Sequence, residues 1–198
     1  MNSRLLAALS APALALSVSA CGINSVPTSE EVAKAKWADV QAAYQRRANL
    51  IPNLVATVKG AATSEERILT NVTQARASAT RITVTPEQLS DPAAMQHFAQ
   101  AQSNLSAALL PITRLQEAYP QLQSQENFKT LMSQLEGTEN RINIAIRDYN
   151  EAVREYNTRI RTFPDMVGAK LVYGAKPLVP FQATTPNADV APTVDFGK

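Results

Sequence analysis

The residues with the strongest chemistry in this chain of 198 residues are a single cysteine, Cys21, and a single histidine, His97. Zinc and iron sites take several Cys or His ligands, so one residue of each type excludes most zinc, iron and thiol chemistry. His97 has Ala94 three residues before it, where a di-metal bundle needs a glutamate. No nucleophile motif of a hydrolase accompanies it. We predict no enzyme activity, no metal site and no cofactor, and interpret His97 as a structural histidine.

Cys21 follows a short apolar segment at the start of the chain. The residues from Leu5 to Val18 are mostly apolar, and as a helix they would span about 21 Å, less than the roughly 30 Å of a bilayer core. Such a segment is typical of an export signal rather than of a membrane span. Val18, Ser19, Ala20 and Cys21 together resemble the lipobox of bacterial lipoproteins, in which the cysteine is acylated and becomes the new amino terminus.

The lipobox resemblance implies a signal peptide over residues 1–20, with Val18, Ser19 and Ala20 recognised by the signal peptidase. Cys21 would then carry acyl chains such as palmitate, which hold a protein at a membrane because each buried CH₂ contributes about 0.8 kcal/mol. The alternative is a solitary cysteine without lipid. The resemblance places the protein in the bacterial cell envelope, facing outside the cytoplasm. Gly22 after the cysteine favours the periplasmic leaflet of the outer membrane in a cell with two membranes.

The charges of the chain are nearly balanced, with 19 Lys plus Arg against 17 Asp plus Glu. No dominant basic face results, which argues against nucleic-acid binding. The adjacent Arg46 and Arg47 are nevertheless a candidate partner surface, because they would attract lipid phosphates or an acidic protein. A solvated face of the first helix is the simpler interpretation of the pair.

A second candidate is a repeated Tyr-Asn pair, Tyr149-Asn150 and Tyr156-Asn157. Its period of seven residues returns to the same face of a helix, which places both tyrosines on a seam between helices and both asparagines beside it. We interpret the repeat as fixing the register of the packed helices. The alternative is a polar pocket for a ligand.

Long helices must position these side chains. The chain has only 6% aromatic residues and few glycines among many Ala and Gln, a composition that favours helices over sheets. Apolar residues recur every seven positions over residues 37–62 and 128–163, and in steps of three and four over residues 68–82 and 95–116. Residues 83–90 are expected to form a loop. The seven-residue rhythm is that of a coiled-coil seam.

Caps and prolines predict where these helices begin and end. Thr28 or Ser29 is expected to cap the first helix, and Thr63 to open the second with a capping box. The third helix is expected to start at Asp91-Pro92, because proline suits the first helical position. Pro164 is expected to end the last helix.

We therefore predict an all-α fold, an elongated antiparallel bundle of about four long helices over residues 32–163. A flexible tether over residues 21–31 precedes it, and an irregular Pro-rich tail over residues 164–198 follows it, with residues 171–173 and 180–181 docked on the bundle. Pro52 costs about 3 kcal/mol inside a helix, but the apolar rhythm continues on both sides of it. We expect one kinked helix there rather than two.

Several long motifs of this sequence closely resemble the LemA family. They are Arg46 to Gly60 (RRANLIPNLVATVKG), Thr73 to Ala77, Glu117 to Ile142, Arg147 to Pro164 (RDYNEAVREYNTRIRTFP) and Val194 to Phe196. The resemblance implies a membrane-anchored antiparallel helical bundle outside the cytoplasm, with no catalytic residues to carry over. Many members begin with a transmembrane helix, where this chain has the lipobox cysteine.

The anchor, the bundle and the absence of a catalytic constellation lead to a functional hypothesis. We expect a lipid-anchored envelope protein that acts as a scaffold or adaptor for other envelope proteins, and the family resemblance adds a link to membrane protein quality control. The alternative is a binding module for a hydrophobic small molecule or lipid held between helices, with Pro52 and Pro111 opening the space.

Overall fold

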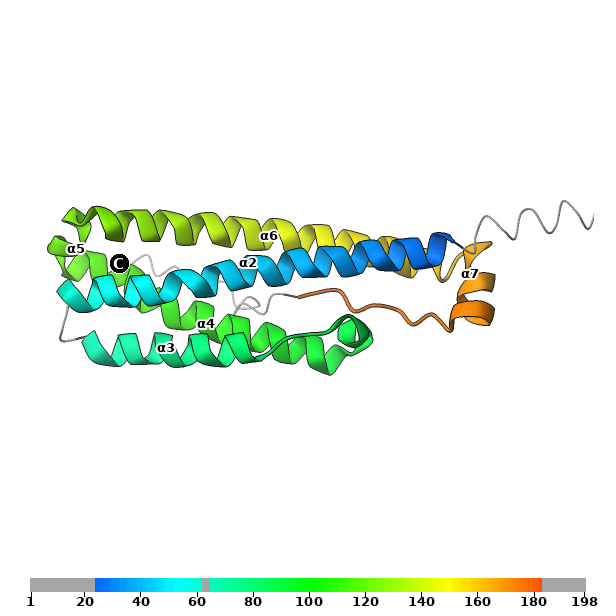
Figure 1. The fold of residues 1–198 in the computed structure, drawn as a ribbon, viewed down its shortest axis with the longest axis horizontal. Coiled ribbons are helices and arrows are strands. Elements are labelled where there is room, and N and C mark those ends of the chain that lie inside the picture. The colour runs from blue at the N-terminus through cyan, green and yellow to red at the C-terminus, as the bar shows by residue number, and fades with distance from the viewer. Residues whose placement is uncertain (1–23, 62–64, 183–198) are drawn as a thin grey trace, which may run out of the picture. The chain divides into compact units, whose positions relative to one another are not determined.

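The computed structural model describes residues 24–61 and 65–182, and its elements are helices (Figure 1). The long helices are α2 (Ser25–Ala61), α3 (Glu66–Arg81), α4 (Pro92–Ala118) and α6 (Glu126–Arg159). The short elements are the 3₁₀ helix η2 (Pro86–Ser90), α5 (Pro120–Ser124), α7 (Asp165–Gly168) and the π-helix η3 (Ala169–Tyr173). Because the described residues contain no strand, the predicted all-α class is confirmed.

The chain folds into two compact units. Within the described residues, unit 1 contains residues 24–43, 85–92 and 141–180, and unit 2 contains residues 44–61, 65–84, 93–140 and 181–182. Helices α2 and α6 each contribute to both units. The sequence pattern does not show this division, because the apolar rhythm of α2 continues unchanged across residue 44.

Unit 2 is a bundle in which consecutive long helices run in opposite directions (Figure 1). The buried positions of α2 in this unit repeat in steps of three and four, as amphipathic helices require. Its core is largely aliphatic and contains Ile51, Leu54, Val58, Leu69, Val72, Leu105, Ile112, Leu122, Phe128 and Leu135. Pro52 is exposed beside this core and α2 continues through it, so the prediction of one helix rather than two is confirmed.

Unit 1 has an aromatic core that is covered by the segment following η3. Trp37 of α2 packs against Tyr149 of α6 with ring centroids 5.1 Å apart. After η3 the chain is extended, and the backbone N–H of Val179 donates a hydrogen bond to the carbonyl of Leu89 in η2 (2.8 Å). Leu178 is buried in the same place. The extended segment therefore packs against η2 and covers part of the core of unit 1.

The start of α2 differs from the prediction. The helix begins at Ser25, so residues 25–31 are helical where a flexible tether was expected. Thr28 and Ser29 lie inside the helix and do not cap it, because their hydroxyl groups donate to the carbonyls of Asn24 (2.7 Å) and Val26 (3.0 Å) in the preceding turn. The cap predicted at Thr63 lies outside the described residues.

The later boundaries are corrected in three places. Residues 86–90 form η2 inside the expected loop, and α6 ends at Arg159, before Pro164. The region after Pro164 begins with the helical residues 165–173 rather than with irregular chain. Leu171 and Val172 are exposed there instead of docked, whereas Phe181 is buried as expected. The large buried apolar side chains of this region are thus Leu178 in unit 1 and Phe181 in unit 2.

Candidate functional site

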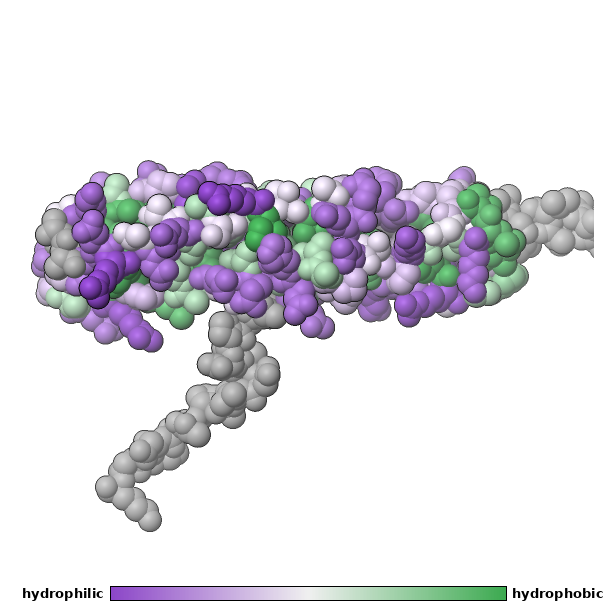
Figure 2. All heavy atoms as spheres, turned by 90° about the horizontal axis from the view of Figure 1, so that it is seen from below, coloured by the Kyte–Doolittle hydropathy of each residue, from purple (hydrophilic) through white to green (hydrophobic). Residues whose placement is uncertain are grey.

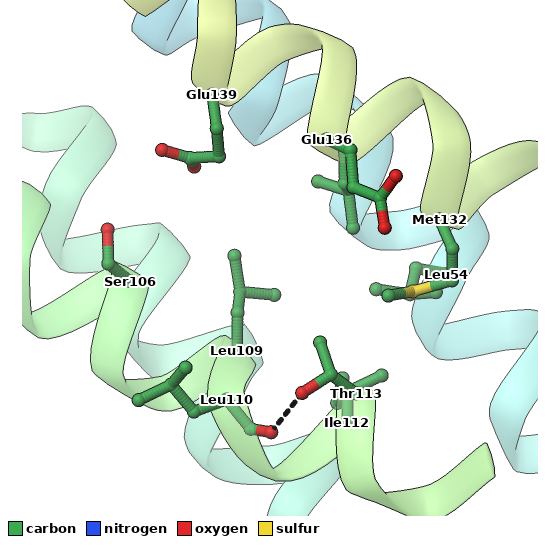
Figure 3. A pocket seen from close by; sticks show the side chains of 10 residues that line it. Leu54, Ser106, Leu109, Leu110, Ile112, Thr113, Met132, Glu136 and Glu139 are labelled. Atoms are coloured by element: carbon green, nitrogen blue, oxygen red, sulfur yellow. Dashed lines mark hydrogen bonds between the residues drawn. The ribbon is translucent and has the colours of Figure 1, made fainter. Parts of the chain in front are cut away.

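The candidate site is an apolar groove in unit 2, between α4 and α6 with α2 at its floor (Figure 3). Its volume is about 310 Å³. Leu54 of α2 and Ile112 of α4 are fully buried at the floor. Leu109 of α4 and Met132 of α6 are half-buried on its walls. The groove is therefore a continuation of the aliphatic core that reaches the surface.

Two adjacent features of α4 open this groove. Leu110 lines it and is 58% exposed, a large fraction for a leucine. The next residue, Pro111, has no backbone N–H to donate to the preceding turn. In the same turn the hydroxyl of Thr113 donates to the carbonyl of Leu110 (2.7 Å) (Figure 3). Leu109, Leu110 and Ile112 cannot all lie on one face of α4, so Leu110 stays at the surface.

The rim of the groove is acidic. Glu136 and Glu139 are exposed residues on α6, and their carboxylates lie at the edge of the hollow (Figure 3). Ser106 of α4 lies opposite them. An apolar floor with carboxylates along one edge suits an apolar group that has positive charge beside it.

Arg47 is a buried cation next to this rim, with only 1% of its surface exposed. Its Nη1 donates to the carboxylate of Glu139 (2.7 Å) and to the hydroxyl of Ser106 (2.8 Å). Its Nη2 donates to the side-chain oxygen (3.0 Å) and the carbonyl (3.2 Å) of Gln102. One guanidinium thus joins α2, α4 and α6 and orients Glu139 at the groove.

The prediction that Arg46 and Arg47 together form a partner surface is wrong for Arg47. Arg46 is exposed, but Arg47 shares the inner face of α2 with Ile51 four residues on and Leu54 seven residues on. A helix face repeats at these intervals, so Arg47 must point inward. The burial is tolerated because the guanidinium makes four hydrogen bonds and one of its acceptors is charged.

Further contacts fix the surroundings of Arg47. Its guanidinium lies over the ring of Tyr44, 5.0 Å from the ring centroid, and the amide of Gln102 donates to the carbonyl of Ala79 (3.3 Å). The Nε atom of Arg76 donates to the carbonyl of Ala48 (2.7 Å). The buried Nε of Arg47 has no acceptor among the described residues. We name Arg47, Gln102, Ser106 and Glu139 the arginine node.

Tyr44 adds an aromatic neighbour to the arginine node. Its ring packs edge-on against Phe98 and Phe181, with centroids 5.5 and 6.2 Å away. Burial raises the pKa of Tyr44 from 10.0 to about 12, Glu139 adds to the shift and Arg47 opposes it. The tyrosine therefore stays neutral beside the cation, and the positive charge of Arg47 is directed at Glu139.

The Tyr-Asn repeat lies in unit 1, and two of its four residues bind the backbone of the segment that follows η3. The hydroxyl of Tyr149 donates to the carbonyl of Val179 (2.9 Å). The side chain of Asn157 binds both backbone groups of Leu178, with its Nδ2 on the carbonyl (2.8 Å) and its Oδ1 on the N–H (2.9 Å). Tyr149 and Asn157 thus hold the C-terminal segment on α6, and Tyr149 also packs against Trp37 of α2, as a seam residue does.

The remaining candidate residues are placed as follows. His97, interpreted from the sequence as a structural histidine, is exposed on the surface of α4. Across residues 24–61 and 65–182, no group of His, Cys, Asp and Glu is arranged to hold a metal ion. No helix in that same part of the chain has both the length and the hydropathy of a membrane span. Cys21 and the lipobox residues Val18, Ser19 and Ala20 lie outside the described residues.

Comparison with known proteins adds one family. The LemA family model matches residues 36–196, which include the arginine node, the groove and the Tyr-Asn repeat. A search of the curated proteins finds no match. The matched range begins after Cys21, so the lipobox is not part of it.

Proposed function

The chain belongs to the LemA family, and we propose that this member is a lipid-anchored adaptor of the cell envelope. In this proposal the groove of unit 2 binds an apolar segment of another envelope protein. The observation that carries it is the open groove of about 310 Å³ with an apolar floor and an acidic rim. The absence of catalytic motifs from the sequence supports a binding role.

The apolar lining of the groove, which lies between two helices, favours an amphipathic segment as its occupant. An amphipathic helix binds such a groove with apolar side chains three or four residues apart. Covering Leu110 would remove apolar surface from water, which contributes about 25 cal/mol per Å². Leu110 is the large apolar residue of the groove with the highest exposure, 58%, so we expect it to contribute most to binding.

The charges of the rim indicate the chemistry of the partner. Glu139 already shares its charge with Arg47, 2.7 Å away, so Glu136 offers the less compensated carboxylate. A segment with Lys or Arg beside its apolar residues would complement this rim. The rim also disfavours fatty acids and anionic lipids in the groove.

The anchor completes the proposal. The lipobox resemblance supports acylation of Cys21, which would keep the groove close to membrane and envelope proteins. The family resemblance suggests that these partners include proteins under membrane protein quality control. Intact mass of the protein extracted from membranes tests the anchor. A chain that begins at Cys21 with added acyl mass is expected, and an unmodified chain that begins at Met1 would contradict it.

Crosslinking in intact cells, followed by affinity purification of the tagged protein, tests the adaptor role. We expect an envelope protein to co-purify with the wild type and to be lost with Leu110→Asp. His97→Asp is the matched control, because His97 is also exposed on α4 but does not line the groove. Recovery of the same proteins with all three chains would contradict the proposal.

A small hydrophobic molecule is the second candidate occupant. The volume of the groove supports it, because about 310 Å³ lies at the lower end of the range of ligand pockets, roughly 300–1,000 Å³. Native mass spectrometry of the purified protein distinguishes the two candidates. A retained molecule that Leu110→Asp removes would favour this one, and a bare chain would favour the adaptor.

A further inference from the structure

A cluster of exposed apolar residues lies at one end of unit 1. Phe163 is 76% exposed, Leu171 81% and Val172 60%, while Val167 and Tyr173 are 45% and 42% exposed. All five lie within eleven residues, in α7, η3 and the turn before them. We name these five residues the apolar tip. Figure 2 shows hydrophobic side chains gathered at the end where Figure 1 places α7.

The exposure of this cluster has no structural explanation within unit 1. The core of the unit is closed by Leu178 and by the tyrosines of α6, and Ala169 is the buried residue of η3. Large apolar side chains gathered on a protein surface mark a place of interaction. The question is therefore what covers the apolar tip.

The apolar tip lies close to the beginning of the described chain. Arg159 at the end of α6 forms an ion pair with Asp165 of α7 (3.8 Å). The same Arg159 lines a hollow together with Asn24 and Thr28 from the start of α2. The first helix therefore begins at the end of unit 1 that carries the apolar tip, as Figure 1 also shows.

This position brings the apolar tip near the predicted lipid anchor. Cys21 is three residues before Asn24. An extended chain spans at most about 3.6 Å per residue, so the two residues are within about 11 Å of each other. If Cys21 is acylated, as proposed above, this end of unit 1 lies at the bilayer surface.

The charges around the apolar tip suit an anionic membrane. Residues 159–176 contain four basic residues, Arg159, Arg161, Lys170 and Lys176, and one acidic residue, Asp165. Arg159 pairs with Glu155 of α6 (2.8 Å) as well as with Asp165, so the positive charge that can meet headgroups comes from Arg161, Lys170 and Lys176, which are exposed. Lys or Arg near a membrane surface is attracted to anionic headgroups, and apolar side chains beside it enter the interface.

We propose that the apolar tip is a second membrane contact, in which Phe163, Leu171 and Val172 enter the headgroup region of an anionic bilayer. The acyl chains on Cys21 would hold the protein at the membrane, and the apolar tip would set the orientation of unit 1 on it. This inference rests on the proposed anchor at Cys21, and the experiment is designed to separate the two.

Tryptophan quenching by brominated lipids tests the contact. The full lipidated protein is purified from membranes and reconstituted on vesicles of phosphatidylethanolamine and brominated phosphatidylglycerol. Leu171→Trp reports on the apolar tip. Ile144→Trp is the matched control, because Ile144 is an exposed apolar residue of unit 1 (42%) on α6, fifteen residues before Arg159. The buried Trp37 is common to both variants.

We expect the added tryptophan at position 171 to lose about half of its emission, and the one at position 144 to be unchanged, because bromines quench only indoles within the interface. Adding Lys170→Glu and Lys176→Glu should weaken the quenching. The protein in this test must show the acyl mass and float with the vesicles. An equal loss of emission at positions 171 and 144 would then contradict the membrane contact of the apolar tip and leave the anchor intact. Protein without acyl mass that does not float would overturn the anchor itself.

Discussion

The two units bury polar side chains in opposite ways. In unit 1, Tyr149 and Asn157 are neutral and bind the backbone of residues 178 and 179, so the core is closed by the chain's own C-terminal segment. In unit 2, the cation Arg47 is buried and binds side chains of α4 and α6. The surface next to it stays open as a groove. We name the hydrogen bonds of Tyr149 and Asn157 to residues 178 and 179 the clamp. The clamp holds the C-terminal segment on unit 1, whereas the buried charge of Arg47 holds the rim of the groove in place.

This difference in buried polar groups suggests a different function for each unit. The charged node fixes Glu139 and leaves Leu110 and Met132 accessible, which suits recognition of another molecule. In unit 1 the hydrogen bonds of Tyr149 and Asn157 hold the C-terminal segment, and five exposed apolar residues form the apolar tip. We therefore propose that unit 2 binds the partner and that unit 1 contacts the membrane.

Replacing the buried cation should have the largest effect. We expect Arg47→Ala to lower the free energy of unfolding by about 3 kcal/mol, because it removes four hydrogen bonds and leaves a cavity beside the buried side chain of Gln102. Arg46→Ala is the control and should change it by less than about 0.5 kcal/mol, since Arg46 is exposed. Urea denaturation measures both variants. Similar values for the two would contradict the role of the arginine node.

Alkaline pH should weaken unit 2 through Tyr44. Its pKa is raised from 10.0 to about 12 in the folded state, so the neutral form is favoured by folding. This contribution is complete below pH 10 and is lost as the pH rises to about 12. Its size is about 2 to 3 kcal/mol, at about 1.4 kcal/mol per pKa unit.

Urea denaturation at a series of pH values measures this loss. Tyr44→Phe should make the decline between pH 10 and 12 shallower without abolishing it. Burial also raises the pKa of Tyr149 and Tyr156, and ion pairs with Glu31 and Glu30 raise that of Lys34, so these residues keep part of the decline. An identical slope in the variant and the wild type would show that Tyr44 is not the group that titrates.

Removing the clamp of unit 1 should have a moderate and local effect. Asn157→Ala removes both hydrogen bonds to Leu178, and we expect a loss of about 1 to 2 kcal/mol. Hydrogen exchange of the Leu178 and Val179 amides should become faster, while that of α3 in unit 2 stays the same. Thr158→Ala serves as the control, because its hydroxyl bonds only to its own helix at Arg154. Unchanged exchange in Asn157→Ala would argue against the clamp.

Replacing the exposed leucine of the groove should have little effect on the free energy of unfolding. Leu110→Asp should change the free energy of unfolding by less than about 0.5 kcal/mol, because Leu110 is 58% exposed. The same variant should lose its protein partner. Thermal unfolding measured beside the co-purification distinguishes a binding residue from a structural one. A large loss of stability would place Leu110 in the core instead.

The sequence predicted the helices better than the sites. Pro52 and Pro111 were expected inside helices, and α4 begins at Pro92 as its cap predicted. Arg47 was missed because arginine is normally exposed. Its interval of seven residues to Leu54 was the available signal. The partners of Tyr149 and Asn157 could not be predicted, because backbone groups look alike in a sequence and only the fold brings residues 178 and 179 to α6.

The groove arises from a conflict that the sequence shows only in part. Leu109, Leu110 and Ile112 surround a proline within one turn of α4, and a single helix face cannot bury all three. Which of them stays exposed depends on the neighbouring helix α6, whose Met132 lies across the groove. The periodicity marks this turn as apolar but does not reveal the opening.

Site-specific photocrosslinking in intact cells tests the central claim most directly. A photoreactive amino acid is placed at Leu110 in unit 2, or at Val32, an exposed apolar residue of unit 1 (45%) that does not line the groove. We predict a protein adduct from position 110 that disappears when Glu136→Lys is added, and no such adduct from position 32. The same adduct from both positions, or none from position 110, would contradict the assignment of binding to the groove of unit 2.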